Sequence, residues 1–200
     1  MYGPKTLLEM VGADTTPCAL ATSTLLLIDM QMEYVDGKLT LPGVDAAVAE
    51  GGRLLARARG AGAPIVHVRH MGKPGGAFDP GGPGSLIADA VAPVDAERVV
   101  EKGLPNAFAS TDLAEALADI GRKELIVAGF MTHMCVSSTV RAALDQGYRS
   151  TVVAAAAGTR DLPRPDGSGV ISAADLHLAS LAALSDRFAV IAAGADDIPE

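Results

Sequence analysis

Thr24-Leu-Leu-Leu-Ile-Asp29 is a short run of consecutive apolar residues that ends in a carboxylate. Apolar residues at successive rather than alternating positions indicate a strand buried on both faces, as in a parallel sheet under helices. Five more runs of strand length follow along the chain, at residues 65–69, 98–102, 124–128, 150–154 and 188–192. The sequence therefore predicts a six-stranded parallel sheet.

Stretches with apolar residues at helical spacing separate these runs, at residues 44–59, 111–120, 135–146 and 172–185. The last begins with Ser172-x-x-Asp175, which has the spacing of a capping box. Alternation of strands and helices predicts a Rossmann-like, three-layer α/β/α domain with right-handed crossovers. Residues 71–84 and 162–169 are rich in Gly and Pro, which predicts loops. Residues 71–84 either line a pocket or form a plain surface connection, because sites in such sheets lie at strand ends.

The composition excludes several classes of protein. The chain has 200 residues, of which 49% are hydrophobic and 20% charged, so it forms one domain rather than a disordered segment. A formal net charge of −8 argues against a nucleic-acid partner. The apolar runs are far shorter than the ~18 residues of a membrane span. With two cysteines, Cys18 and Cys135, and no leader pattern, we expect a cytoplasmic protein.

Residues 1–22 form an N-terminal extension ahead of a domain that spans residues 23–200. The Gly and Pro content of the extension predicts no firm element, and no motif surrounds Cys18. We expect a frayed terminus; an arm that docks onto a neighbouring subunit is the alternative.

Three of the predicted strands end in or lead to a reactive side chain: Asp29, Lys102 and Cys135. Carboxyl ends of parallel strands meet at one edge of the sheet, so we expect a nucleophile with a base and a cation there. Cys135 begins a predicted helix, and the N–H groups at a helix start stabilise a thiolate. The sequence therefore predicts that Cys135 is mostly thiolate near neutral pH, although a free cysteine is more often a small buried apolar residue.

These residues also carry a family resemblance. Asp29-Met-Gln31, the Lys102 stretch at residues 101–108, and Gly129-Phe-Met-Thr-His-Met-Cys-Val136 resemble the isochorismatase-like cysteine hydrolases. The resemblance runs from about residue 24 to 193 and includes Gly-Thr-Arg-Asp-Leu-Pro at residues 158–163. It implies the six-stranded fold of that family, and hydrolysis of a small amide-type C–N bond without a cofactor. Relatives that cleave a vinyl ether carry Gly where Cys135 stands, so the cysteine favours C–N hydrolysis.

The resemblance also assigns roles to residues. Asp29 takes the thiol proton, Lys102 orients Asp29 and Cys135 forms a thioester with the substrate. Backbone N–H groups of Met131 and Cys135 form the oxyanion hole, and the peptide bond between Phe130 and Met131 is cis. Relatives are commonly oligomers, which implies a homo-oligomer.

Candidate pocket residues are mostly small or apolar, which suggests a compact amide with an apolar or unsaturated body: Tyr34, Leu41, Phe78, Phe108, Thr132 and His133. His133 is two positions from Cys135, so a Cys–His pair is an alternative to the pair of Asp29 and Lys102. His177 lies in the last predicted helix and is interpreted as a surface or packing residue.

His67 and His70 raise the question of a metal. Metal-dependent nicotinamidase-like relatives hold a metal with an Asp and two His in this segment. However, residues three apart on a continuous strand point to opposite faces, so both histidines could bind one metal only if the strand stops at about Arg69. We therefore predict no bound metal, and a metal-dependent nicotinamidase-like amidase is the alternative.

Besides a cysteine hydrolase, the sequence leaves two hypotheses of a different class. One is a nucleotide- or flavin-binding protein on a doubly wound sheet, but the chain has no GxGxxG after the first strand and no GxxxxGK[ST]. The second is a non-catalytic family member that acts in binding or assembly. The presence of Asp29, Lys102 and Cys135 weighs against it without excluding it.

Overall fold

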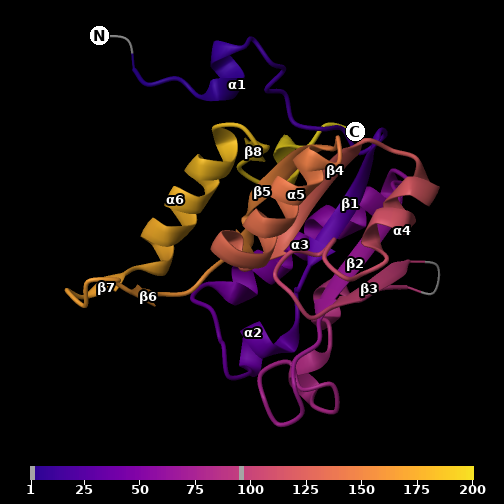
Figure 1. The fold of residues 1–200 in the computed structure, drawn as a ribbon. Coiled ribbons are helices and arrows are strands. Elements are labelled where there is room, and N and C mark those ends of the chain that lie inside the picture. The colour runs from indigo at the N-terminus through magenta and orange to yellow at the C-terminus, as the bar shows by residue number, and fades with distance from the viewer. Residues whose placement is uncertain (1–2, 95–96) are drawn as a thin grey trace.

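The computed structural model describes residues 3–94 and 97–200, and its core is a parallel sheet of six strands (Figure 1). The strands lie in the order β3-β2-β1-β4-β5-β8, and every neighbouring pair is parallel. Their bounds are Ser23–Ile28 (β1), Ile65–His70 (β2), Arg98–Lys102 (β3), Glu124–Phe130 (β4), Arg149–Gly158 (β5) and Val190–Ala192 (β8). The predicted six-stranded α/β fold is confirmed.

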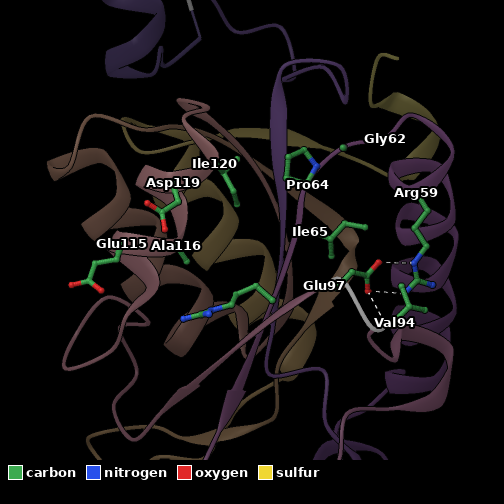
Figure 2. A pocket seen from close by; sticks show the side chains of 12 residues that line it. Arg59, Gly62, Pro64, Ile65, Val94, Glu97, Glu115, Ala116, Asp119 and Ile120 are labelled. Carbon is green, nitrogen blue, oxygen red and sulfur yellow. Dashed lines mark hydrogen bonds and ion pairs between the residues drawn. The ribbon is translucent and has the colours of Figure 1, made fainter.

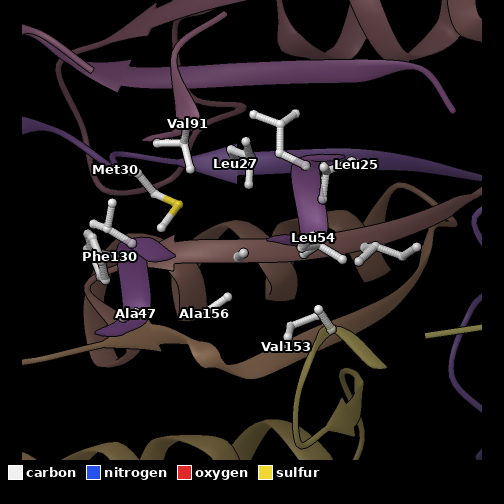
Figure 3. Close-up of a cluster of buried hydrophobic side chains, with 14 of the residues drawn as sticks. Leu25, Leu27, Met30, Ala47, Leu54, Val91, Phe130, Val153 and Ala156 are labelled. Carbon is white, nitrogen blue, oxygen red and sulfur yellow. The ribbon is translucent and has the colours of Figure 1, made fainter. Parts of the chain in front are cut away.

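Helices cover both faces of this sheet. Helix α3 (Val44–Gly60) lies on one face, and helices α4 (Leu113–Ile120), α5 (Ser137–Asp145) and α6 (Ala173–Ser185) lie on the other (Figure 1). Two short helices, α1 (Leu7–Met10) and α2 (Met32–Asp36), were not predicted. In β1, Leu25 and Leu27 pack in the core under α3, which Figure 3 shows, whereas Leu26 and Ile28 pack in the core under the other helices. Burial on both faces explains the consecutive apolar residues of this strand.

The order of the strands places a topological switch between β1 and β4. The chain proceeds from β1 outward through β2 to β3, and then crosses to β4 and continues outward on the other side. At this switch the two strands come unusually close, because Gly129 has no side chain. A Cβ atom there would lie 1.9 Å from the carbonyl oxygen of Ile28, and the φ of Gly129 is +127°. Open α/β sheets bind ligands at such a switch, beyond the carboxyl ends of the strands.

Several predicted boundaries are wrong around this edge. Strands β4 and β5 run beyond residues 128 and 154, because the pairing resumes after a bulge with Gly129 opposite Ala157 and Phe130 opposite Gly158. The helix predicted at 135–146 begins at Ser137, and a π-helical turn at Thr132–Val136 precedes it. Within the predicted loop 162–169, Leu162–Pro163 (β6) forms a strand that pairs with Val170–Ile171 (β7) in a small antiparallel hairpin.

The N-terminal extension is not a frayed terminus over its described residues. The backbone N–H of Cys18 donates to Thr151 Oγ1 at 2.8 Å, and that of Leu20 donates to the Pro199 carbonyl at 2.9 Å. Both side chains are buried in the core under α3. The segment therefore packs on its own domain, at the end of the sheet opposite α2 (Figure 1), while residues 1–2 lie outside the described residues. Across the described residues, no helix has both the length and the apolar character needed to cross a membrane.

Candidate active site

The structure brings the three predicted reactive residues together at the carboxyl edge of the sheet. Asp29 follows β1 directly, Lys102 is the last residue of β3, and Cys135 lies in the π-helical turn after β4. Lys102 Nζ lies 2.7 Å from Asp29 Oδ2 and 3.3 Å from Cys135 Sγ. All three residues are buried. One ammonium group therefore contacts both a carboxylate and a thiol inside the protein.

Local backbone geometry turns Asp29 toward its partners. Asp29 has a φ of +52°, a left-handed conformation that is costly for a residue with a side chain. Its N–H still donates to the Val68 carbonyl at 2.8 Å, and its own carbonyl accepts from the Gln31 N–H at 2.8 Å. The chain thus leaves the strand in a tight turn, and left-handed backbone of this kind tends to occur at functional sites.

Burial and charge make the resting Cys135 a neutral thiol. Burial raises the pKa of the Cys135 thiol to about 12, and the nearby Asp29 carboxylate contributes to this rise, against the opposing effect of Lys102. Burial also raises the pKa of Asp29, although Lys102 acts in the opposite direction. The prediction of a thiolate near neutral pH is therefore wrong. The prediction failed because Cys135 lies in a buried turn beside a carboxylate and not at the start of a helix. Attack by Cys135 therefore requires a group that takes the proton of its thiol.

Aromatic side chains from α2 and from the loop at residues 71–84 pack beside this site. The ring of Tyr34 meets the rings of Phe78 and Phe130 edge-on, with centroids 5.1 and 5.6 Å apart. The buried Glu33 carboxylate holds the loop on α2, because it accepts the Phe78 N–H at 3.1 Å and the Lys38 N–H at 2.7 Å. The loop at 71–84 therefore reaches the site instead of being a plain surface connection.

Two of the predicted pocket residues lie elsewhere. Phe108 stacks on Tyr148, just before β5 begins, with ring centroids 6.3 Å apart. Tyr148 precedes the amino end of β5, whereas Cys135 follows the carboxyl end of β4, so the pocket prediction for Phe108 is wrong. Leu41 is buried in the core, and its N–H donates to the Tyr34 carbonyl at 3.0 Å. It therefore lies in the same core cluster as Tyr34.

Thr132 and His133 precede Cys135 in the same π-helical turn, and among the described residues their side chains are bonded to other partners than the thiol. His133 Nδ1 lies 2.5 Å from Thr159 Oγ1, so this ring nitrogen is hydrogen-bonded to Thr159 and not to Cys135. Thr132 is fully buried, and its hydroxyl donates to the Gly158 carbonyl at 3.0 Å. His177 Nδ1 lies 2.8 Å from the same hydroxyl, so this half-buried histidine of α6 supports the π-helical turn that contains Cys135. Nothing in the sequence pattern indicated this role of His177.

Arg160 is a second residue of the site that could not be assigned from the sequence. Its positive charge helps lower the pKa of His133, in addition to burial, and it opposes the raised pKa of Tyr34. Its Nε is buried and has no hydrogen-bond partner among residues 3–94 and 97–200. Arg160 belongs to the Gly-Thr-Arg-Asp-Leu-Pro motif at residues 158–163. The motif drew attention to this segment but did not indicate which residues lie near Arg160.

Comparison with known proteins assigns the family. Residues 23–196 match the family model described as the isochorismatase domain. The chain belongs to the isochorismatase family. Its fold is similar to the crystal structure of an isochorismatase from Pseudomonas putida KT2440, with a TM-score of 0.93 and 46% identity, covering 98% of this chain and 100% of the other.

Curated isochorismatase-family relatives cover most of the chain. A streptothricin hydrolase of Streptomyces noursei is 37% identical over 94% of this chain and 77% of its own length. A secreted isochorismatase effector of Verticillium dahliae is 36% identical over 94% and 96%, and a maleamate amidohydrolase of Pseudomonas putida is 33% identical over 68% and 72%. These relatives confirm the prediction of an isochorismatase-family amidohydrolase. The cytoplasmic location and the homo-oligomer stay predictions, and one relative is secreted.

The two histidines of β2 do not form a common site in this family member. His67 Nε2 lies 2.9 Å from Glu97 Oε2, on the face of the sheet that α3 covers, whereas His70 Nδ1 lies 3.2 Å from Lys102 Nζ. Within the described ranges, no group of three or more His, Cys, Asp or Glu side chains is arranged to hold a metal ion.

We expect activity to survive exhaustive chelation, because His67 and His70 are bonded to different partners. The measurement is steady-state turnover before and after dialysis against a chelator, with total metal content determined on the same samples. A loss of activity that zinc, iron or manganese restores would instead place the protein with the metal-dependent nicotinamidase-like enzymes.

A cavity of about 570 Å³ lies away from these residues (Figure 2). Residues at the starts of β2 and β3 line it, including Ile65 and Arg98, together with the last turns of α3 and α4. The triad of Asp29, Lys102 and Cys135 lies at the opposite, carboxyl edge of the sheet. None of the residues that line this cavity belongs to the group around Cys135, so we do not assign it as the active site despite its size.

Proposed function

We propose that this protein hydrolyses a small, non-peptide amide through a thioester on Cys135. The observation that carries the proposal is the buried Lys102 ammonium, which contacts the Asp29 carboxylate at 2.7 Å and the Cys135 sulfur at 3.3 Å. This arrangement joins a nucleophile to a base and a cation, as covalent catalysis requires. The name of the maleamate amidohydrolase supports a C–N bond as the target.

Acylation begins when Asp29 accepts the thiol proton and the sulfur attacks the amide carbonyl carbon. Lys102 stabilises the negative charge that passes from the carboxylate to the sulfur. The proton held by Asp29 then passes to the leaving nitrogen, so ammonia or an amine departs and the acyl group stays on Cys135. Water, with its proton taken by Asp29, attacks the thioester in the second half of the reaction. The products are the free carboxylic acid and the restored thiol.

Backbone donors are available for the negative oxygen that forms during attack. The peptide bond between Phe130 and Met131 is cis, as the family resemblance implies. No acceptor in the described part of the chain takes a hydrogen bond from the Met131 N–H. We assign this N–H, together with that of Cys135, to the oxyanion hole, because fixed donors stabilise developing charge better than mobile water does.

Arg160 gives the proposed substrate site a polar end. Its buried Nε has no partner in the described ranges, and its effect on the pKa values of His133 and Tyr34 indicates a positive charge near these two side chains. An amide that carries a carboxylate, as maleamate does, would supply the missing acceptors. The aromatic rings of Tyr34 and Phe78 would contact the apolar or unsaturated part of the same molecule.

Replacing Arg160 by glutamine should raise the KM for maleamate roughly 10-fold or more, because the hydrogen bonds to a charged group are lost. The KM for a neutral amide of similar size should change little. Arg164→Gln is the matched control, since Arg164 is an exposed arginine of the same segment. Equal effects of Arg160→Gln on charged and neutral amides would contradict this role.

An amide screen with ammonia detection tests the proposed function itself. Wild-type protein should release ammonia from at least one small amide, and Cys135→Ala should release none from the same compound. If no amide is hydrolysed while one is bound, the non-catalytic hypothesis is favoured.

A further inference from the structure

The order of the strands sets a geometric problem for Lys102. The lysine ends β3 and Asp29 follows β1, but β2 lies between these two strands. The Lys102 side chain must therefore cross the end of β2 to reach the carboxylate. The residue at that end is His70, which lies directly opposite Lys102 in the register of β2 and β3.

The Lys102 ammonium has three N–H groups, and the structure places three partners around it, one in an ion pair and two in hydrogen bonds. They are Asp29 Oδ2 at 2.7 Å, Cys135 Sγ at 3.3 Å and His70 Nδ1 at 3.2 Å. The lysine side chain is fully buried, so water does not supply a substitute. Without His70, one N–H of a buried cation would lack a partner, which is costly.

We propose that His70 is a positioning residue that accepts a hydrogen bond from Lys102 and thereby holds the ammonium between Asp29 and Cys135. This inference rests on the proposed function, because the ammonium matters only if Cys135 reacts. It adds to the triad a residue that is bonded to neither the thiol nor the carboxylate.

The protonation state of His70 agrees with this role. Nδ1 accepts a hydrogen bond only in a neutral ring whose proton is on Nε2. Burial lowers the pKa of His70 to about 4, and the Lys102 charge acts in the same direction. The ring is therefore neutral at neutral pH, with an acceptor available for the ammonium.

Gln31 fixes the backbone from which the His70 side chain projects. Gln31 Oε1 accepts the His70 N–H at 2.7 Å, and Gln31 Nε2 donates to the His70 carbonyl at 3.0 Å and to the Ser85 carbonyl at 2.9 Å. The Phe78 ring meets the imidazole edge-on with centroids 5.0 Å apart. The Gln of Asp29-Met-Gln31 thus connects the carboxylate motif to the residue that holds the lysine.

A pair of variants separates this role from simple packing. His70→Asn keeps an acceptor oxygen near the position of Nδ1, whereas His70→Leu has a similar size but no acceptor. Both remove the imidazole ring and its contact with Phe78. We expect kcat of the Leu variant to lie at least about 10-fold below that of the Asn variant, with little difference in KM. Equal kcat values in the two variants would overturn the proposal, whether both are active or both are impaired.

A second readout needs no substrate. Iodoacetamide alkylates the thiolate, so the alkylation rate of Cys135 at fixed pH reports how well Lys102 stabilises it. We expect the rate to fall in His70→Leu and to be largely retained in His70→Asn, while Cys18 in the same protein serves as the internal reference. Equal Cys135 rates in the two variants would overturn the positioning role. The separate outcome that Cys135→Ala retains turnover would instead overturn the proposed function.

Discussion

Cys135→Ser is expected to lower kcat by at least about 10⁴-fold, because removal of a catalytic nucleophile has effects of this order or larger. A serine hydroxyl is much harder to ionise than a thiol. The site already raises the pKa of the thiol to about 12 through burial and the Asp29 carboxylate. The same surroundings would disfavour a serine alkoxide still more, so Asp29 cannot activate it.

The measurement combines ammonia release with intact mass. Wild-type protein that is quenched during turnover of a slow amide should carry an acyl group on the peptide that contains Cys135, and Cys135→Ser should not. Cys18→Ser is the matched control, since Cys18 is the other free cysteine and lies buried near the start of β5, where Arg149 contacts its sulfur at 3.2 Å. Near-normal turnover by Cys135→Ala would contradict the covalent route and favour direct attack by water with Asp29 as the base.

The fold could be predicted because the pattern of each strand is local. The strand from Leu25 to Ile28 is buried on both faces, and the sequence shows this as four consecutive apolar residues. The meeting of Asp29, Lys102 and Cys135 follows from the same reasoning, since parallel strands bring their carboxyl ends to one edge. Ser172 caps α6 as its spacing predicted, because its hydroxyl accepts the Asp175 N–H at 3.1 Å.

The electrostatic state of the site could not be predicted in this way. The pKa of Cys135 depends on how deeply the turn after β4 is buried and on how close it lies to Asp29, and both are properties of the packed protein. The position of Phe108 depends on its stacking on Tyr148, which belongs to a distant part of the chain. The contact of His70 with Lys102 depends on β2 lying between two other strands, which needs the strand order.

Asp29→Asn should separate the two effects of the carboxylate on the thiol. As the base, Asp29 takes the proton of Cys135, and the amide of asparagine cannot, so we expect kcat to fall by at least about 100-fold. As a negative charge, Asp29 raises the pKa of Cys135, so its removal should lower that pKa. Alkylation of Cys135 at neutral pH should therefore become faster in the variant that has lost turnover.

Opposite changes in turnover and alkylation are hard to obtain from a damaged fold, which would alter Cys18 as well. His133→Ala is the matched control, because His133 is bonded to Thr159 and not to the thiol. It should keep most of the wild-type kcat.

If His133→Ala is inactive while Asp29→Asn turns over normally, the base is His133, and the Lys102–Asp29 ion pair at 2.7 Å is structural. If both variants are slow and alkylation is unchanged, the carboxylate does not control the charge on the sulfur. The opposing pKa effects of Asp29 and Lys102 on Cys135 favour Asp29 as the base, which disfavours the resting thiolate and still removes the proton during attack.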